Sequence, residues 1–142
     1  DLDLLVRLAA AGKPGYFIPE RLMEYRCHGG QTSLKQDIHF LTAKIFCLES
    51  YRFTDRPKLE ASRNSKLNGL KQVLAMRLIE KGEAQRGRQL IQELAASGSL
   101  SSKVRLGKIL SYLPLGLRQL AFQGFRQLRP NDYSERVRNA AG

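Results

Sequence analysis

The feature of this sequence that most constrains its fold is a helical spacing of apolar residues after residue 33. Apolar residues that recur every three or four positions lie on one side of an α-helix, which must then be covered by another element. The stripes before residue 98 are Leu34, Ile38, Leu41, Ile45 and Leu48; Leu67, Leu70, Leu74 and Leu78; and Leu90, Ile91 and Leu94. This spacing predicts helices that pack through their apolar faces.

Helix boundaries are marked by capping and turn-forming residues. Ser33 and Gln36 form an S-x-x-Q capping box, so a long helix is predicted to start there. Other boundaries are predicted between Thr54 and Pro57, at Gly82, and at Ser97 with Gly98. The helices from about 60 to 97 resemble one tetratricopeptide-type unit, but no second copy follows at a fixed period, so a single helical hairpin is predicted.

The region after Gly98 is basic and apolar. Ser101 is a candidate N-cap for a helix that Pro114 breaks. The predicted apolar stripe is Leu106, Ile109, Leu110 and Leu113, continued by Leu117, Leu120, Ala121, Phe125 and Leu128. No acidic residue lies between Leu94 and Asn131, whereas the basic residues there are Lys103, Arg105, Lys108, Arg118, Arg126 and Arg129. Two interpretations stay open: the stripe contacts an anionic membrane surface, or it packs on the hairpin and leaves the cations in solvent.

The overall charge favours anionic partners. The 142 residues hold 24 Lys and Arg against 13 Asp and Glu, a net charge of +11. No nucleic-acid-binding motif accompanies this charge, so a nucleic acid is not the expected partner. Cys27 and Cys47 have no CxxC spacing, and no uncharged stretch reaches the ~20 residues of a membrane span. We expect a cytoplasmic protein, peripheral at the inner face of the membrane if the basic helices bind lipid.

The first 33 residues combine a short helix with two extended runs around Pro19. Asp1 shares a helix face with Leu4, Leu5 and Leu8, and we expect this face to be buried. Asp3 lies four residues before Arg7, the favourable order for a helical ion pair.

Three of these residues carry candidate chemistry. Asp1 at the head of a helix is either a general base or only a helix cap. Arg26 and His28 are two apart and would share one side of a strand, where they could meet a diphosphate and its metal ion. His28 before Gly29 and Gly30 is otherwise an ordinary loop residue.

The runs DLDLLVRL, YFIPERL and YRCHGG, in this order, resemble the end of the catalytic domain of family-2 glycosyltransferases with the GT-A fold. The resemblance covers residues 1–33. It implies that Asp1 is the catalytic base that deprotonates the acceptor hydroxyl, and that His28 approaches the metal and the diphosphate, with Arg26 beside it. Asp3 and Arg7 match structural positions.

The resemblance also implies the reaction and the partners. A sugar would pass from a nucleotide-sugar donor to a glycan or lipid-linked acceptor, by an inverting displacement assisted by a divalent metal, Mg or Mn. The family's nucleotide-binding half, with its Asp-x-Asp motif, would lie upstream of Asp1. Asp1 and Asp3 cannot replace that motif, because residues two apart diverge on a helix. We therefore expect this segment alone to be an inactive fragment.

The expected fold is mainly α: the C-terminal edge of a GT-A α/β domain, with one helix and two short strands, followed by an irregular bundle of about five helices. The expected divisions are residues 1–33 for the transferase edge, 34–98 for a helical extension, 99–130 for the basic amphipathic helices and 131–142 for a flexible tail. The alternative to a transferase is a non-catalytic helical module that binds a protein or a membrane surface.

Overall fold

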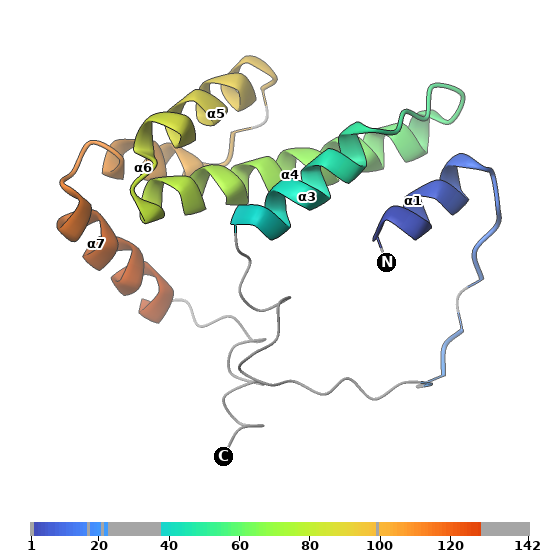
Figure 1. The fold of residues 1–142 in the computed structure, drawn as a ribbon, viewed down its shortest axis with the longest axis horizontal. Helices are drawn as coiled ribbons and strands as arrows, with labels where there is room; N and C mark the ends of the chain where they lie inside the picture. The colour runs from blue at the N-terminus through green and yellow to red at the C-terminus, as the bar shows by residue number, and fades with distance from the viewer. Residues whose placement is uncertain (1, 17, 21, 23–37, 99, 129–142) are drawn as a thin grey trace.

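The computed structural model describes residues 2–16, 18–20, 22, 38–98 and 100–128. This part of the chain is mainly helical, as predicted. Its helices are α1 (Leu2–Ala10), α3 (Ile38–Glu49), α4 (Pro57–Lys81), α5 (Ala84–Ala96), α6 (Ser102–Leu110) and α7 (Leu115–Leu128). Figure 1 shows α4 as the long central helix, with α1 and α3 along one end and α5, α6 and α7 around the other.

The ends of α4 follow the turn signals in the sequence. Pro57 occupies the first turn, where the missing N–H of proline has no cost. Gly82 has φ 104°, a left-handed conformation that favours glycine. The N–H of Glu83 then donates to the carbonyl of Leu78 over 2.9 Å, which closes the helix and turns the chain into α5. The predicted hairpin of α4 and α5 is therefore confirmed.

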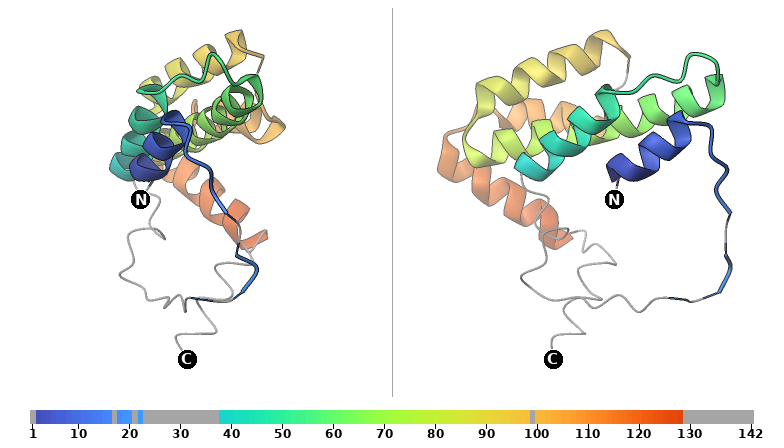
Figure 2. Two further views of the ribbon diagram at one scale, coloured as in Figure 1. Left: turned by 90° about the vertical axis from the view of Figure 1, so that its right-hand side faces the viewer. Right: turned by 45° about the vertical axis from the view of Figure 1, so that its right-hand side comes forward.

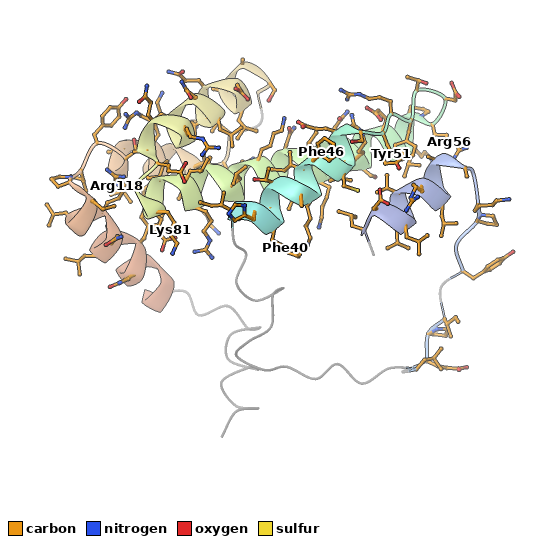
Figure 3. The ribbon with its side chains drawn as sticks, viewed as in Figure 1. Phe40, Phe46, Tyr51, Arg56, Lys81 and Arg118 are labelled. Atoms are coloured by element: carbon orange, nitrogen blue, oxygen red, sulfur yellow. The ribbon has the colours of Figure 1, made fainter. Side chains whose placement is uncertain are left out.

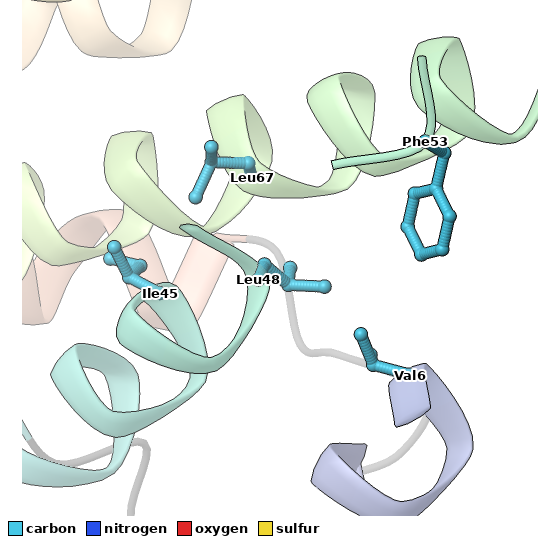
Figure 4. Close-up of a cluster of buried hydrophobic side chains, with 5 residues drawn as sticks. All are labelled: Val6, Ile45, Leu48, Phe53 and Leu67. Atoms are coloured by element: carbon cyan, nitrogen blue, oxygen red, sulfur yellow. The ribbon is translucent and has the colours of Figure 1, made fainter. Parts of the chain in front are cut away.

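Two hydrophobic clusters divide the interior. The first joins α1, α3 and the first half of α4 and is built on Val6, Ile45, Leu48, Phe53 and Leu67 (Figure 4). The second joins the other half of α4 to α5, α6 and α7 and is built on Ala75, Ile79, Ile91, Val104 and Phe122. Because α4 contributes to both clusters, it sets the relative position of α1 and α7.

The α4–α5 crossing is close because Gly87 faces α4. A Cβ atom on Gly87 would lie 2.6 Å from Cγ1 of Ile79 and 2.9 Å from the backbone oxygen of Ala75. Carbon atoms in van der Waals contact are about 3.5–4.0 Å apart. Glycine at this position therefore permits the approach that buries Ile79 and Ile91.

Arginines hold four helix C-termini. The last carbonyls of a helix lack partners within the helix and carry partial negative charge, so a guanidinium donor stabilises them. The donor–acceptor pairs are Arg56 with Ala9 O of α1 at 2.5 Å, Arg63 with Leu48 O of α3 at 2.8 Å, Arg118 with Ile79 O of α4 at 2.9 Å, and Arg88 with Ser111 O after α6 at 3.2 Å. Figure 3 labels Arg56 and Arg118 at opposite ends of the molecule. Part of the positive charge of the chain thus serves the fold.

The predicted strands of a transferase edge are not found where the structure describes the chain. Tyr16, Ile18 and Pro19 belong to the first extended run and form no strand, and Tyr16 and Ile18 are exposed. A strand needs a neighbour that accepts and donates its backbone hydrogen bonds. No partner strand lies among the described residues, and the second run, from Tyr25 to His28, lies outside them.

The predicted apolar face of α1 is wrong, because Leu4, Leu5 and Leu8 are exposed, whereas Val6 is buried and Leu2 and Ala9 pack against the same cluster. In the basic region, where two interpretations were open, Leu106, Ile109, Leu113, Leu117 and Leu120 are exposed and so do not pack on the hairpin. Val104, Phe122 and the partly buried Leu110 pack in the second cluster instead. Each of these helices has apolar residues on two sides, and the rest of the bundle covers only one of them. The capping box of Ser33 and Gln36 lies outside the described residues.

Candidate functional site

The helix α1 is the part of the candidate transferase site that the structure describes. It begins directly after Asp1, the predicted base, which itself lies outside the described residues, as do Arg26 and His28. Their roles therefore stay predictions. The geometry around α1 nevertheless defines the framework on which Asp1 would be carried.

The predicted ion pair on α1 is confirmed. Arg7 Nη2 lies 2.7 Å from Asp3 Oδ2, and both side chains are more than half exposed. An exposed pair of this kind adds only about 0.3–0.5 kcal/mol to a helix. Its main effect on the site is to engage Asp3 in a local ion pair.

Asp3 has a second neighbour on α3. The thiol of Cys47 lies 3.9 Å from Asp3 Oδ1. Desolvation raises the pKa of Cys47, and the negative charge of Asp3 and its hydrogen bond to the thiol raise it further. Cys47 is accordingly favoured as the neutral thiol near neutral pH.

The opposite end of α1 is fixed by Arg56. Its guanidinium donates to Ala9 O and lies against Gly12, where a Cβ atom would meet Arg56 Nη2 at 2.9 Å. Gly12 has φ 71°, the left-handed conformation that ends many helices. Arg56 comes from the turn before α4, so α1 is tied to the helical bundle at both its apolar side and its end.

The two sides of α1 differ in solvent exposure. Val6 is 7% exposed in the first cluster, whereas Leu4 and Leu5 are 56% and 62% exposed. Figures 2 and 4 show α1 lying beside α3, with Val6 directed into the cluster. One side of this helix is therefore bound to the bundle, and the other side presents three leucines for a further contact.

Metal ligands are not assembled in the described part of the chain. No group of three or more His, Cys, Asp or Glu side chains is found there, and His39 is an exposed residue of α3. The described residues thus supply no complete set of oxygen or nitrogen ligands for Mg or Mn, which prefer octahedral oxygen-rich sites.

A shallow hollow of about 710 Å³ lies on the outer side of α4. It is lined mainly by small side chains and one cation between Ala61 and Val73. No convergent set of acids, amides or histidines lines it, so it lacks the polar groups that orient a substrate.

Exposed apolar side chains also gather on α6 and α7. Ile109 and Leu120 are 67% and 64% exposed, while Arg118, predicted as one of the solvated cations, is 7% exposed and donates to Ile79 O and Leu113 O. The sequence offered one signal for this inversion, because Arg118 and Phe122 are four residues apart and so share a helix face. Long side chains such as arginine are seldom buried, which is why the position was missed.

No helix in the described residues is long and apolar enough to cross a membrane. Comparison with known proteins returned no relative: no protein-family model matches the chain, and no curated protein or solved structure matches it. The resemblance of residues 1–33 to family-2 glycosyltransferases therefore rests on their own motifs.

Proposed function

We propose that this chain is the C-terminal part of a nucleotide-sugar-dependent glycosyltransferase that acts in glycan or polysaccharide biosynthesis. The observation that carries the proposal is the order of three motifs in residues 1–33: DLDLLVRL, then YFIPERL, then YRCHGG. In this proposal Asp1 is the general base, and Arg26 and His28 bind the diphosphate of the donor, His28 also near a divalent metal. The helices from α3 onward support α1 and hence Asp1.

The two-sided character of α1 supports this assignment. A helix at the edge of a catalytic domain packs on that domain, while Val6 and Arg56 attach α1 to the bundle. The exposed Leu4, Leu5 and Leu8 are the side chains that a catalytic domain would cover. Full burial of an exposed leucine is worth about 1.5–3 kcal/mol, so covering these partly exposed side chains would favour the contact.

In the proposed mechanism Asp1 acts as a general base. The acceptor hydroxyl donates its proton to the Asp1 carboxylate as its oxygen attacks the anomeric carbon of the donor sugar, and the nucleoside diphosphate departs. A divalent metal supplies charge stabilisation for the departing diphosphate when it is bound. α1 begins at Leu2, and the backbone N–H groups of a helix start would favour the ionised form of a carboxylate that precedes it.

The test measures metal-dependent release of nucleoside diphosphate from a panel of sugar nucleotides. It needs the longer polypeptide that the resemblance implies, in which the nucleotide-binding half precedes Asp1. Asp1→Asn is expected to lower turnover by about 10²-fold or more while donor binding is retained, because the base is lost. Asp3→Asn is the matched control and is expected to stay within about threefold of wild type, since Asp3 is engaged by Arg7.

Full activity of Asp1→Asn would refute the role of Asp1 as base. His28→Ala is expected to weaken donor and metal affinity instead, and a purely kcat effect would refute that role. If wild type releases no diphosphate with any donor, the non-catalytic helical module becomes the better interpretation. In the isolated chain of 142 residues, titration calorimetry should find weak or no binding of nucleotide sugars.

A further inference from the structure

We infer that α6 and α7 form a docking surface for an anionic lipid bilayer. This inference concerns a region that the proposed transferase chemistry does not use, and it stands independently of that chemistry. It rests on the outward apolar side chains of both helices, on the exposed cations of α6 and on the absence of acids in the sequence around them.

The apolar component is an outward ridge on each helix. Leu106 and Ile109 are three residues apart on α6 and are 40% and 67% exposed. Leu117 and Leu120 have the same spacing on α7 and are 56% and 64% exposed. Residues three apart lie on one side of a helix, so each helix presents a ridge and not scattered leucines. Tyr112 and Leu113 between the helices, and Leu115 at the start of α7, are exposed as well.

The opposite sides of the same helices already pack in the hydrophobic core, so the exposed ridges are additional apolar surface. Val104 on α6 and Phe122 on α7 are buried in the second cluster, and Gly107 packs so closely on Met76 that a Cβ atom would lie 2.2 Å from its sulfur. The helices are therefore already seated on α4 by their other sides. In Figures 1 and 2, α7 projects away from the α4–α5 pair, which leaves its outer side accessible.

The charge identifies the occupant. Lys103 and Arg105 are exposed on α6, and the helical periodicity places them on the two flanks of the ridge formed by Leu106 and Ile109. Lys108 on the same helix is half-buried. The sequence from Leu94 to Asn131 contains no acid that would neutralise them. An amphipathic helix with an apolar ridge and flanking cations lies in the headgroup region of anionic membranes, with its apolar side about 5–10 Å deep.

Other occupants fit this surface less well. A second copy would bring the same cations against each other, because the face has no acids to pair with them. A single-stranded nucleic acid would favour aromatic stacking surfaces, and the exposed ridge side chains are aliphatic apart from Tyr112.

The chain has no tryptophan, which makes a direct experiment available. Leu120→Trp places the sole tryptophan on the proposed surface, and Phe46→Trp places it on α3, where Phe46 is 72% exposed. The probes are vesicles of phosphatidylcholine alone and vesicles with roughly one-third phosphatidylglycerol. We expect a blue shift, with quenching by brominated acyl chains, for Leu120→Trp with the anionic vesicles only. Phe46→Trp should show neither change.

Two further variants separate the apolar and charged contributions in vesicle co-sedimentation. Ile109→Ser with Leu120→Ser, and separately Lys103→Glu with Arg105→Glu, are each expected to weaken binding by about tenfold or more. The controls are Phe46→Ser and the exposed α4 pair Lys58→Glu with Lys66→Glu, which should bind like wild type. Circular dichroism melts should be unchanged in all variants, because every replaced side chain is exposed or lies outside the two clusters.

Several results would overturn the inference. These are equal binding of wild type to neutral and anionic vesicles, no binding to either, or equal losses in the controls. A wild-type dimer in light scattering that Ile109→Ser with Leu120→Ser converts to a monomer would assign the surface to a second copy. Lipid-independent capture of an acidic protein through Lys103 and Arg105 would assign it to a protein partner.

Discussion

The two hydrophobic clusters at opposite ends of α4 differ in how they treat a buried arginine. In the first cluster region, Arg63 caps α3 and also donates to Glu60 through Nε at 3.0 Å and Nη2 at 2.6 Å. In the second, Arg118 caps α4 and donates to Leu113 O, but among the described residues it meets no acid, and its buried Nε has no hydrogen-bond partner there. An acidic neighbour therefore compensates the charge of Arg63, whereas backbone carbonyls are the acceptors of Arg118. The helices around Arg118 also turn leucines outward, which is typical of a surface that meets a partner.

The largest effect on stability is expected from replacing Arg63, the arginine that is paired with Glu60. Arg63→Met leaves Leu48 O and the Glu60 carboxylate without their guanidinium donor, and we expect a loss of about 3 kcal/mol in the free energy of unfolding. Arg118→Met also loses two hydrogen bonds, but it removes an unpaired buried charge, so about 1–2 kcal/mol is expected. Urea denaturation measures both. A larger loss of unfolding free energy in Arg118→Met than in Arg63→Met would contradict the difference described between the two ends.

A smaller effect is expected at the crossing that joins the ends. Gly87→Ala should lower the free energy of unfolding by about 1–3 kcal/mol, because its Cβ would collide with Ile79 and the Ala75 carbonyl. Gly69→Ala on α4 is the matched control. No atom lies within 4 Å of its Cβ position, so alanine should stabilise the helix by about 0.5–1 kcal/mol. If both variants are stabilised, the close crossing of α4 and α5 is incorrect.

The first end should also respond to acid. Glu60 accepts hydrogen bonds from Arg63 and from the N–H of Phe53, which lower its pKa from 4.5 to about 2. A lowered pKa in the folded state stabilises the protein above the unfolded pKa, and that contribution is lost as pH falls. The free energy of unfolding should therefore decrease from pH 4.5 toward pH 2.

Glu60→Gln should flatten this decrease, because the neutral amide does not titrate. Glu49→Gln is the control, since Glu49 forms a more exposed ion pair with Lys71. Denaturation at a series of pH values compares the slopes. An unchanged slope in Glu60→Gln would show that Glu60 does not set the acid sensitivity.

The smallest effect concerns Cys47. Because burial and Asp3 raise the pKa of its thiol, Cys47 should react slowly with a thiol reagent near pH 8. Asp3→Asn should accelerate the reaction by about two- to threefold, because the thiolate no longer faces a carboxylate. The rates are compared in a Cys27→Ser background, and both proteins should react equally in urea. Equal folded-state rates would contradict the contact between α1 and α3.

The sequence predicted the elements better than their orientation. The α4–α5 hairpin follows from the apolar spacing of both helices with Gly82 as the turn between them. On α1 and α7, apolar side chains lie on two sides, and spacing alone does not say which side meets the bundle. The arginine caps escaped prediction because their acceptors are backbone carbonyls distant in the sequence.

In the candidate site, too, only the local features could be predicted from the sequence and then confirmed. The Asp3–Arg7 pair is local, depends only on helical spacing, and is confirmed. Asp1, Arg26 and His28 depend on a resemblance and on residues outside the described part of the chain, so their roles stay predictions. The exposed Leu4, Leu5 and Leu8 connect the confirmed helix to the predicted site, because they mark the side of α1 on which a catalytic domain would pack.

The most direct test of the account is whether that side of α1 is covered in the longer polypeptide that the proposed function implies. Leu5→Cys, in a background with Cys27 and Cys47 replaced by serine, is labelled in the chain of 142 residues and in the longer polypeptide. Leu5 is 62% exposed here, so fast labelling is expected in the shorter chain and at least about tenfold slower labelling in the longer one. Ser62→Cys on the outer side of α4 should label equally in both. Equal labelling of Leu5→Cys in the two proteins would contradict the proposal that α1 joins the helical bundle to a transferase domain.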